Sequence, residues 1–281
     1  MLFRSALAGS EGGQRRISIK GGVFREMIGN KEVRTSDDRA INVVIIKAAP
    51  SVHRTYFEGT YVEGQNASPT CWSSNNQTPD ASVPADQKQA AKCMDCAQNI
   101  KGSASQGDGR ACRFQQRIAV LLEGETAKRE VYQVICPATS VFGDGEKGKL
   151  PLQAYGRHLK AHNTPVAGVI TEMRFDTASP TPKLIFKPVR PITEDEYNDV
   201  EATRNSAEAD EAIKLTVVIK PKDEFAPAAA PAPKPKVETK PEAKAKVEAE
   251  EVEEPKKAAP KKSATPTEAP SLGELVEGWD D

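Results

Sequence analysis

The stretch that decides how this chain is organised reads PTCWSS at residues 69–74, CMDC at residues 93–96 and ACRF at residues 111–114. It holds four of the five cysteines. A Cys-x-x-Cys pair brings two thiolates to one metal ion from a single turn, and one further cysteine on each side completes a tetrahedron. The spacing therefore predicts one Zn²⁺, with ligands Cys71, Cys93, Cys96 and Cys112.

Two other interpretations of the cysteines remain open, namely two disulfides and unrelated buried thiols. The odd number of cysteines and the absence of a secretory signal sequence favour zinc, because both argue against an oxidising compartment. The residues between Trp72 and Cys93 are mostly polar and offer little apolar surface to bury, so a metal is needed to order them. With four sulfur ligands no coordination position is left for a catalytic water, and the predicted zinc is structural.

Outward from this insertion the chain predicts β-strands, because short runs of apolar and β-branched residues are bounded by turn residues. One helix begins at Pro151, and an acidic helix begins at a capping box, Thr193-Glu-Asp-Glu196. The resulting order is strands, cysteine-rich insertion, strands, helix, two strands. It favours a mainly β fold, an OB-type five-stranded Greek-key barrel with one helix, over another small β-barrel or a sandwich. The expected strands are Arg15–Phe24, Ile41–Ile46, Arg113–Leu122, Glu130–Cys136, Val166–Phe175 and Lys183–Val189.

Composition divides the chain into five parts. Residues 1–14 form a flexible arm, 15–192 the OB-type domain with the zinc module inserted at 69–114, and 193–220 an acidic helix and a short strand. Residues 221–270 are almost entirely Ala, Pro, Lys and Glu, which predicts a disordered linker. The last part, residues 271–281, carries four acidic residues and no base. From residue 221 onward the net charge is -4, so the rest of the chain carries +3.

No pattern typical of an enzyme is present. The run GDGEKGK at residues 143–149 lacks the Gly-Lys-Ser/Thr ending of a phosphate loop. His158 and His162 share a helix face but lack the glutamate of a metalloprotease motif, so they are interpreted as a solvated helix end. Cys136 lies in an apolar strand and is expected to be a buried small hydrophobe. We therefore expect a binding protein, not an enzyme.

Aromatic residues interleaved with basic residues indicate what is bound. Aromatic rings stack on unpaired bases while Arg and Lys contact phosphates, a combination that suits single-stranded nucleic acid. Phe24, Phe114, Phe175 and Phe186 lie in apolar strands and are expected in the core. The predicted DNA-binding residues are Arg16, Lys20, Arg25, Lys47, Arg54, Tyr56, Phe57, Tyr61, Trp72, Arg113 and Arg117.

The OB-type strand order, the inserted cysteine module and the acidic C-terminal tail resemble bacteriophage single-stranded DNA-binding proteins. Residues 15–192 carry the resemblance, and the cysteine module is its most specific part. The zinc-containing helix-destabilising proteins of T-even phages are the nearest architectural parallel, although they use a histidine among their zinc ligands. The resemblance implies sequence-tolerant binding of single-stranded DNA in phage replication, recombination or repair, in the cytoplasm of the infected host cell.

The resemblance also implies that the acidic tip recruits replication or recombination proteins of the polymerase, helicase or primase class and competes with DNA. The residues expected to bind the partner are Leu275, Trp279, Asp280 and Asp281. No stretch approaches the roughly 20 apolar residues of a membrane span, so a soluble intracellular protein is expected. The alternatives are a zinc-ribbon adaptor or transcription accessory protein, whose main ligand is another protein, and a virion or structural protein.

Overall fold

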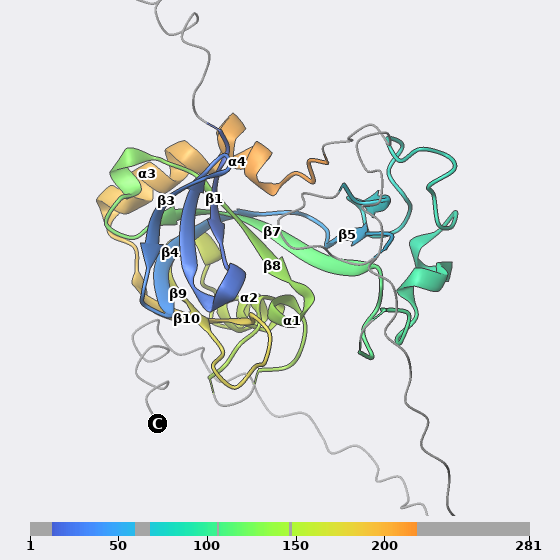
Figure 1. The fold of residues 1–281 in the computed structure, drawn as a ribbon. Helices are drawn as coiled ribbons and strands as arrows, with labels where there is room; N and C mark the ends of the chain where they lie inside the picture. Colours follow the sequence, from blue (N-terminus) through green and yellow to red (C-terminus); the bar gives the residue numbers. More distant parts are fainter. Residues whose placement is uncertain (1–12, 60–67, 106, 146–147, 218–281) are drawn as a thin grey trace, which may run out of the picture. The chain divides into compact units, whose positions relative to one another are not determined.

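The computed structural model describes residues 13–59, 68–105, 107–145 and 148–217 (Figure 1). These residues belong to one compact unit, and a second unit, residues 219–268, lies outside them. Tyr61, most of the N-terminal arm, the linker and the acidic tip with its four predicted partner-binding residues also lie outside the described residues. In the described part of the chain, no helix has the length and apolar character needed to cross a membrane.

The described residues contain one ten-stranded sheet with the order β10-β9-β4-β7-β8-β1-β2-β3, and β5 pairs with both β6 and β7. Neighbouring strands are antiparallel except β1 and β8, which are parallel. The nine-residue strand β4 is central because it pairs with β7 on one side and β9 on the other. The strands are β1 Arg15–Ser18, β2 Phe24–Ile28, β3 Lys31–Ser36, β4 Ala40–Ala48, β5 His53–Tyr56, β6 Cys71–Ser73, β7 Arg113–Leu122, β8 Tyr132–Pro137, β9 Val169–Phe175 and β10 Leu184–Pro191.

The fold is mainly β. Its sheet is curled into a half-barrel, and the inner face of the sheet encloses the main core (Figure 1). Alternate residues of each strand point to opposite faces, so Ile118 and Val120 of β7 join this inner core. Curling brings β2 to β9, where the rings of Phe24 and Phe175 lie 4.5 Å apart. Helices α1 (Ala138–Val141) and α2 (Leu152–Ala161) cover the open side, and Tyr155 of α2 is fully buried there.

A second, smaller core lies on the outer face of the sheet. Ala119 and Leu121, which alternate with the inner residues of β7, pack there beneath α3 (Glu194–Arg204) and α4 (Ala207–Ile213). The capping box predicted for α3 is confirmed: the Glu196 backbone N–H donates to Thr193 Oγ1, and the Thr193 N–H donates to the Glu196 carboxylate. The short 3₁₀ turns are η1 Lys20–Gly22, η2 Cys93–Asp95, η3 Ala97–Asn99, η4 Thr126–Lys128 and η5 Val166–Gly168.

Most predicted elements are present. The mainly β class, the two hairpins β7–β8 and β9–β10, the central strand β4 and the helix α2 are confirmed. Cys136 is fully buried in the inner core, where burial raises the pKa of its thiol to about 12. Phe24, Phe175 and Phe186 are buried as expected, and Phe114 packs partly against the same core.

Two expectations differ from the structure. A five-stranded barrel with one helix was expected, with six strand ranges predicted along the chain, but the described residues contain ten strands and a second helix, α1, on the inner side. The run Lys31–Ser36 was missed because β3 is an exposed edge strand without apolar alternation. One acidic helix was expected after the capping box, but the structure has two, α3 and α4, with a break at Ser206. This residue is extended, and its side chain accepts from the Ala209 N–H to cap α4.

Candidate metal centre and nucleic-acid interface

The cysteine module is built on the end of the main sheet. Strand β5 pairs with the start of β7 and with β6, so Cys71 on β6 and Cys112, just before β7, lie on either side of β5. Cys93 opens η2, and Cys96 separates η2 from η3. Three separate segments thus bring the four thiols to the root of the module.

All four thiols line one cavity of about 20 Å³. Cys71, Cys93 and Cys96 are buried and Cys112 is partly buried, and none of the five cysteines of the chain forms a disulfide. A volume of this size accommodates one water-sized particle. As the side chains stand, no three His, Cys, Asp or Glu groups in the described ranges meet the geometry of a metal site.

Backbone groups support the thiols in the manner of an outer ligand shell. The N–H groups of Gln89 and Trp72 hydrogen-bond to the Cys71 thiol. The Cys112 N–H donates to the Gln98 carbonyl at 2.8 Å, which ties the last cysteine to the segment after η2. The pKa of the Cys112 thiol is raised to about 11, chiefly by burial, while the positive charge of Arg54 opposes the shift.

Arg54 is buried beneath the module, with an exposed fraction of 2%. Its Nε donates to Asn76 Oδ1 and its Nη1 donates to the Cys93 carbonyl at 3.4 Å, while its Cζ lies 4.3 Å from the centre of the Phe114 ring. Arg54 was expected to contact DNA; the structure places its charged group inside the protein, where it joins the module to Phe114 of β7.

Trp72 and Arg117, which were also predicted to bind DNA, are buried as well. Trp72 forms the small core of the module with Val83, and its Nε1 donates to Ser82 Oγ at 3.2 Å. Arg117 Nη1 donates to His53 Nδ1 at 3.0 Å. Burial lowers the pKa of Arg117 to about 10. Burial, followed by the charge of Arg117, lowers the pKa of His53 to about 4, so its imidazole is neutral and accepts the bond.

Among the other predicted residues, three basic side chains of the barrel are partly buried. Lys47 Nζ lies 2.5 Å from Asp210 of α4, and Arg25 pairs with Glu32 at 3.2 Å. Arg16 carries a buried Nε without a partner in the described residues. Tyr56 is partly buried, whereas the residues with substantial exposure are Lys20, Phe57 and Arg113.

The module and the barrel differ in how many of their described basic residues have a carboxylate partner. Most arginines of the barrel form ion pairs, for example Arg15 with Glu130 and Arg129 with Asp199. In the described part of the module, five exposed cations form none. These are Lys88, Lys92, Lys101, Arg110 and Arg113.

Phe142 and Arg110 were missed by the sequence analysis. Phe142 follows α1 and is 40% exposed, with its ring edge-on to Phe114 at 5.8 Å. Arg110 lies just before Cys112, and its Cζ is 5.7 Å from the Phe114 ring centre. The sequence signal that could have identified Phe142 is that it is a single aromatic residue directly before a polar, glycine-rich loop.

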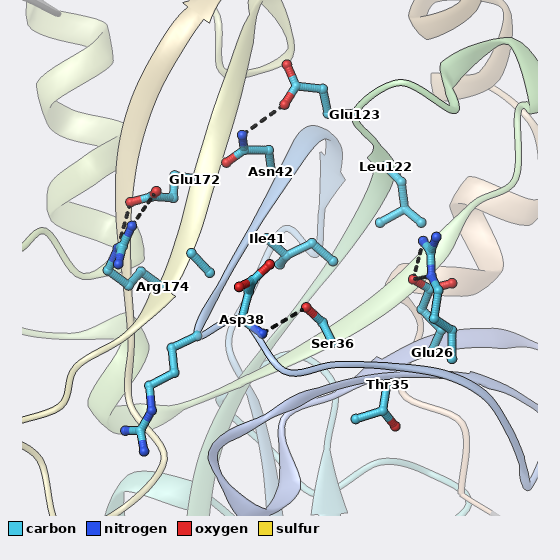
Figure 2. Close-up of a pocket in the computed structure, with 13 residues that line it drawn as sticks. Glu26, Thr35, Ser36, Asp38, Ile41, Asn42, Leu122, Glu123, Glu172 and Arg174 are labelled. Carbon is cyan, nitrogen blue, oxygen red and sulfur yellow. Dashed lines mark hydrogen bonds and ion pairs between the residues drawn. The ribbon is translucent and has the colours of Figure 1, made fainter.

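A larger pocket, of about 580 Å³, lies at one end of the half-barrel between the β2–β3 hairpin and strands β4 and β9. Figure 2 shows Glu172 and Arg174 joined by two hydrogen bonds, at 2.9 and 2.8 Å, and Asn42 directed at Glu123. Three arginines and four carboxylates line the pocket, so its net charge is -1. This balance does not favour a polyanion, and the unpaired cations of the module are the better place for one.

Comparison of the chain with known protein families, with curated proteins and with solved structures finds no match. Three groups of side chains in the described residues are able to bind a ligand. They are the four thiols that share one cavity, the exposed cations of the module that form no ion pair, and the exposed aromatic rings. His158 and His162 of α2 contact each other, with ring centres 4.8 Å apart, and in the described ranges no third metal-ligating side chain joins them. These features suit a binding surface.

Proposed function

We propose that this chain binds single-stranded DNA without sequence preference, through an OB-type half-barrel that carries a zinc-ordered module. The observation that carries the proposal is the strand order. Strands β4, β7 and β8 form an antiparallel meander, α2 follows β8, and the β9–β10 hairpin returns so that β9 pairs with β4. A three-strand meander, a helix and a returning hairpin describe a partly open OB barrel.

The other strands are additions to that five-strand unit. In the sheet, β1 joins β8 and continues through β2 to β3, while β5 and β6 extend β7. The edge of the unit at β8 is thus covered by β1. This supports an OB-type core within a larger sheet.

The position of the module supports nucleic-acid binding. OB folds bind oligonucleotides across their second and third strands and with the loops that join strands 1–2 and 4–5. In this chain those strands are β7 and β8, and residues 49–112, which include the module, join the first two strands. Four of the five exposed cations of the module for which the described residues contain no ion pair therefore lie in a connection that OB folds use for binding, and the fifth, Arg113, opens β7.

Zinc would order the module in this proposal. Its small core contains Cys71, Trp72 and Val83, with Tyr56, Leu215 and Val217 partly buried against it. So small a core does not offset the entropy of ordering about forty residues. The thiols of Cys71, Cys93, Cys96 and Cys112 have the donor type and number for a structural Zn²⁺, which supplies folding free energy when bound.

A zinc-ribbon adaptor is the second candidate, and one observation favours it. Met94 and Ile100 are 68% and 64% exposed on the module, and exposed apolar side chains are typical of protein-binding surfaces. Such an adaptor would bind another protein and contact nucleic acid weakly.

Fluorescence anisotropy with labelled oligo-dT, a duplex and an RNA oligomer separates the two functions. The zinc-loaded full chain is expected to bind oligo-dT more tightly than duplex, with an affinity that falls steeply as salt rises. Tighter binding to duplex, or binding to none of the three, would remove the first proposal and leave the adaptor.

A further inference from the structure

An aromatic ring, Phe142, and a guanidinium, Arg110, both contact the ring of Phe114, where the end of α1 meets the cysteine module. Phe142 comes directly after α1, and its backbone N–H donates to the Ala138 carbonyl at 3.0 Å, so the helix end fixes its position. Its ring meets Phe114 at an interplanar angle of 87°, in an edge-to-face contact. One edge of the Phe142 ring is thus supported, and 40% of the residue stays exposed.

Arg110 reaches the same aromatic ring from the module. Its Nε donates to the Asn99 carbonyl at 2.7 Å, which orients the guanidinium. Within the described ranges its other N–H groups have no hydrogen-bond partner and no carboxylate pairs with it. An oriented guanidinium with free N–H groups is suited to a phosphate oxygen.

Phe114 connects the two groups and is itself held from both sides. It packs against the inner core, and Arg54 lies 4.3 Å from its ring centre while bonding to the Cys93 carbonyl. Barrel and module therefore both position Phe114, and through it Phe142 and Arg110. A site with such support loses little conformational entropy when a ligand binds.

We infer that Phe142 and Arg110 form a one-nucleotide site for single-stranded nucleic acid, in which an unpaired base stacks on Phe142 and its neighbouring phosphate pairs with Arg110. The inference rests on the proposed function and adds to it the residues that contact the strand. A base inside a duplex has no free face for this ring, so the site selects single strands. Neither residue was expected from the sequence.

Substitution separates the two contacts. Phe142→Ala is expected to weaken oligo-dT binding roughly five-fold to a hundred-fold, the range for losing one stacked base, with the salt dependence unchanged. Arg110→Gln is expected to reduce the slope of log affinity against log salt by about 0.7, the value for one phosphate contact on a single strand. Matched controls are Tyr197→Ala, an exposed aromatic on the acidic helix α3, and Arg157→Gln, an exposed arginine of α2.

A tryptophan reporter gives a second measurement that keeps the site intact. Oligo-dT is expected to quench the fluorescence added by Phe142→Trp, and Tyr197→Trp is expected to show no quenching beyond the wild type. If the wild type binds oligo-dT while Phe142→Ala binds equally well and Phe142→Trp is not quenched, this site is wrong and the proposed function stands. If the wild type fails to bind oligo-dT, the proposed function is wrong and the site falls with it.

Discussion

The aromatic rings of Phe24 and Phe175 are in contact, with centres 4.5 Å apart, although four strands separate β2 from β9 in the order of the sheet. This contact spans the inside of the half-barrel and links the N-terminal strands to the proposed OB-type unit. Phe24 is 1% exposed and Phe175 is 4% exposed, so both rings are part of the core.

Truncation of either ring is expected to destabilise the fold strongly. Phe24→Ala or Phe175→Ala should lower the free energy of unfolding by about 3–5 kcal/mol, because a cavity remains where the ring was. Chemical denaturation measures the loss. The loss of unfolding free energy in the double variant should be smaller than the sum of the losses in the two single variants. The difference should be about 0.5–1.5 kcal/mol, which is the contribution of the ring contact itself. Strict additivity would contradict the contact.

Zinc is expected at one ion per chain. Elemental analysis of the purified protein measures it, and Cys93→Ser should lower the zinc content well below one. Cys136→Ala is the matched control, because Cys136 lies in the inner core away from the other thiols, and it should keep its zinc. Chelation should increase amide hydrogen exchange in residues 69–112 before it does so in β4 or β7. A metal-free protein with an equally protected module would contradict the zinc centre.

Arg54 and Arg113 are expected to behave differently, although both were assigned to DNA from the sequence. Arg54→Ala removes the buried bonds to Asn76 and Cys93, so it should cost about 1.5–3 kcal/mol of stability. Arg113 is exposed, and Arg113→Ala should change stability by less than about 0.5 kcal/mol. Arg113→Ala should instead reduce the slope of log affinity for oligo-dT against log salt by about 0.7. Equal effects on the slope would show that Arg54 reaches the DNA.

The buried contact between His53 and Arg117 is expected to make stability depend on pH. The pKa of His53 in the folded protein is about 4, below the ordinary value of 6.5, so between these values the unfolded chain binds a proton that the folded protein does not. The contribution of neutral His53 to the free energy of unfolding is therefore complete above about pH 6.5 and is lost as the pH falls toward 4. Thermal denaturation of the wild type and of His53→Gln, whose amide oxygen still accepts from Arg117, tests this. The melting temperature of His53→Gln should depend less on pH between about 4 and 6.5 than that of the wild type. Parallel curves of melting temperature against pH for the two proteins would contradict the role of His53.

Removal of residues 271–281, which lie outside the described residues, is expected to tighten binding to oligo-dT at low salt. The disordered linker of about fifty residues that the composition predicts would span roughly 40 Å, and the acidic tip would then reach the barrel and compete with phosphates. Above roughly 0.2 M salt the Debye length is below about 8 Å and the difference should vanish. Anisotropy of full-length and truncated protein at two salt concentrations measures it. Equal affinities at low salt would leave the tip only its predicted role in recruiting partners through Leu275 and Trp279.

The sequence by itself determined the local elements with strong periodic signals. Strand β4 is apolar enough to be central, and Thr193 and Glu196 form a capping box that depends only on residues three apart. The spacing of Cys71, Cys93, Cys96 and Cys112 also placed four thiols in one predicted cluster, and all four line one cavity. These features depend on short-range periodicity or on a rare residue type, both of which can be recognised in a linear chain.

The tertiary structure alone decided which charged and aromatic residues face solvent. A basic residue next to an aromatic one suggests a nucleic-acid surface, but the packing around β5 and β7 buries both Arg54 and Arg117. The same folding leaves Phe142 exposed beside the ring of Phe114, 28 residues earlier in the chain. Exposure depends on which strands come together across long sequence separations. Composition therefore predicts a kind of ligand, and only the packed sheet shows which side chains are exposed to solvent.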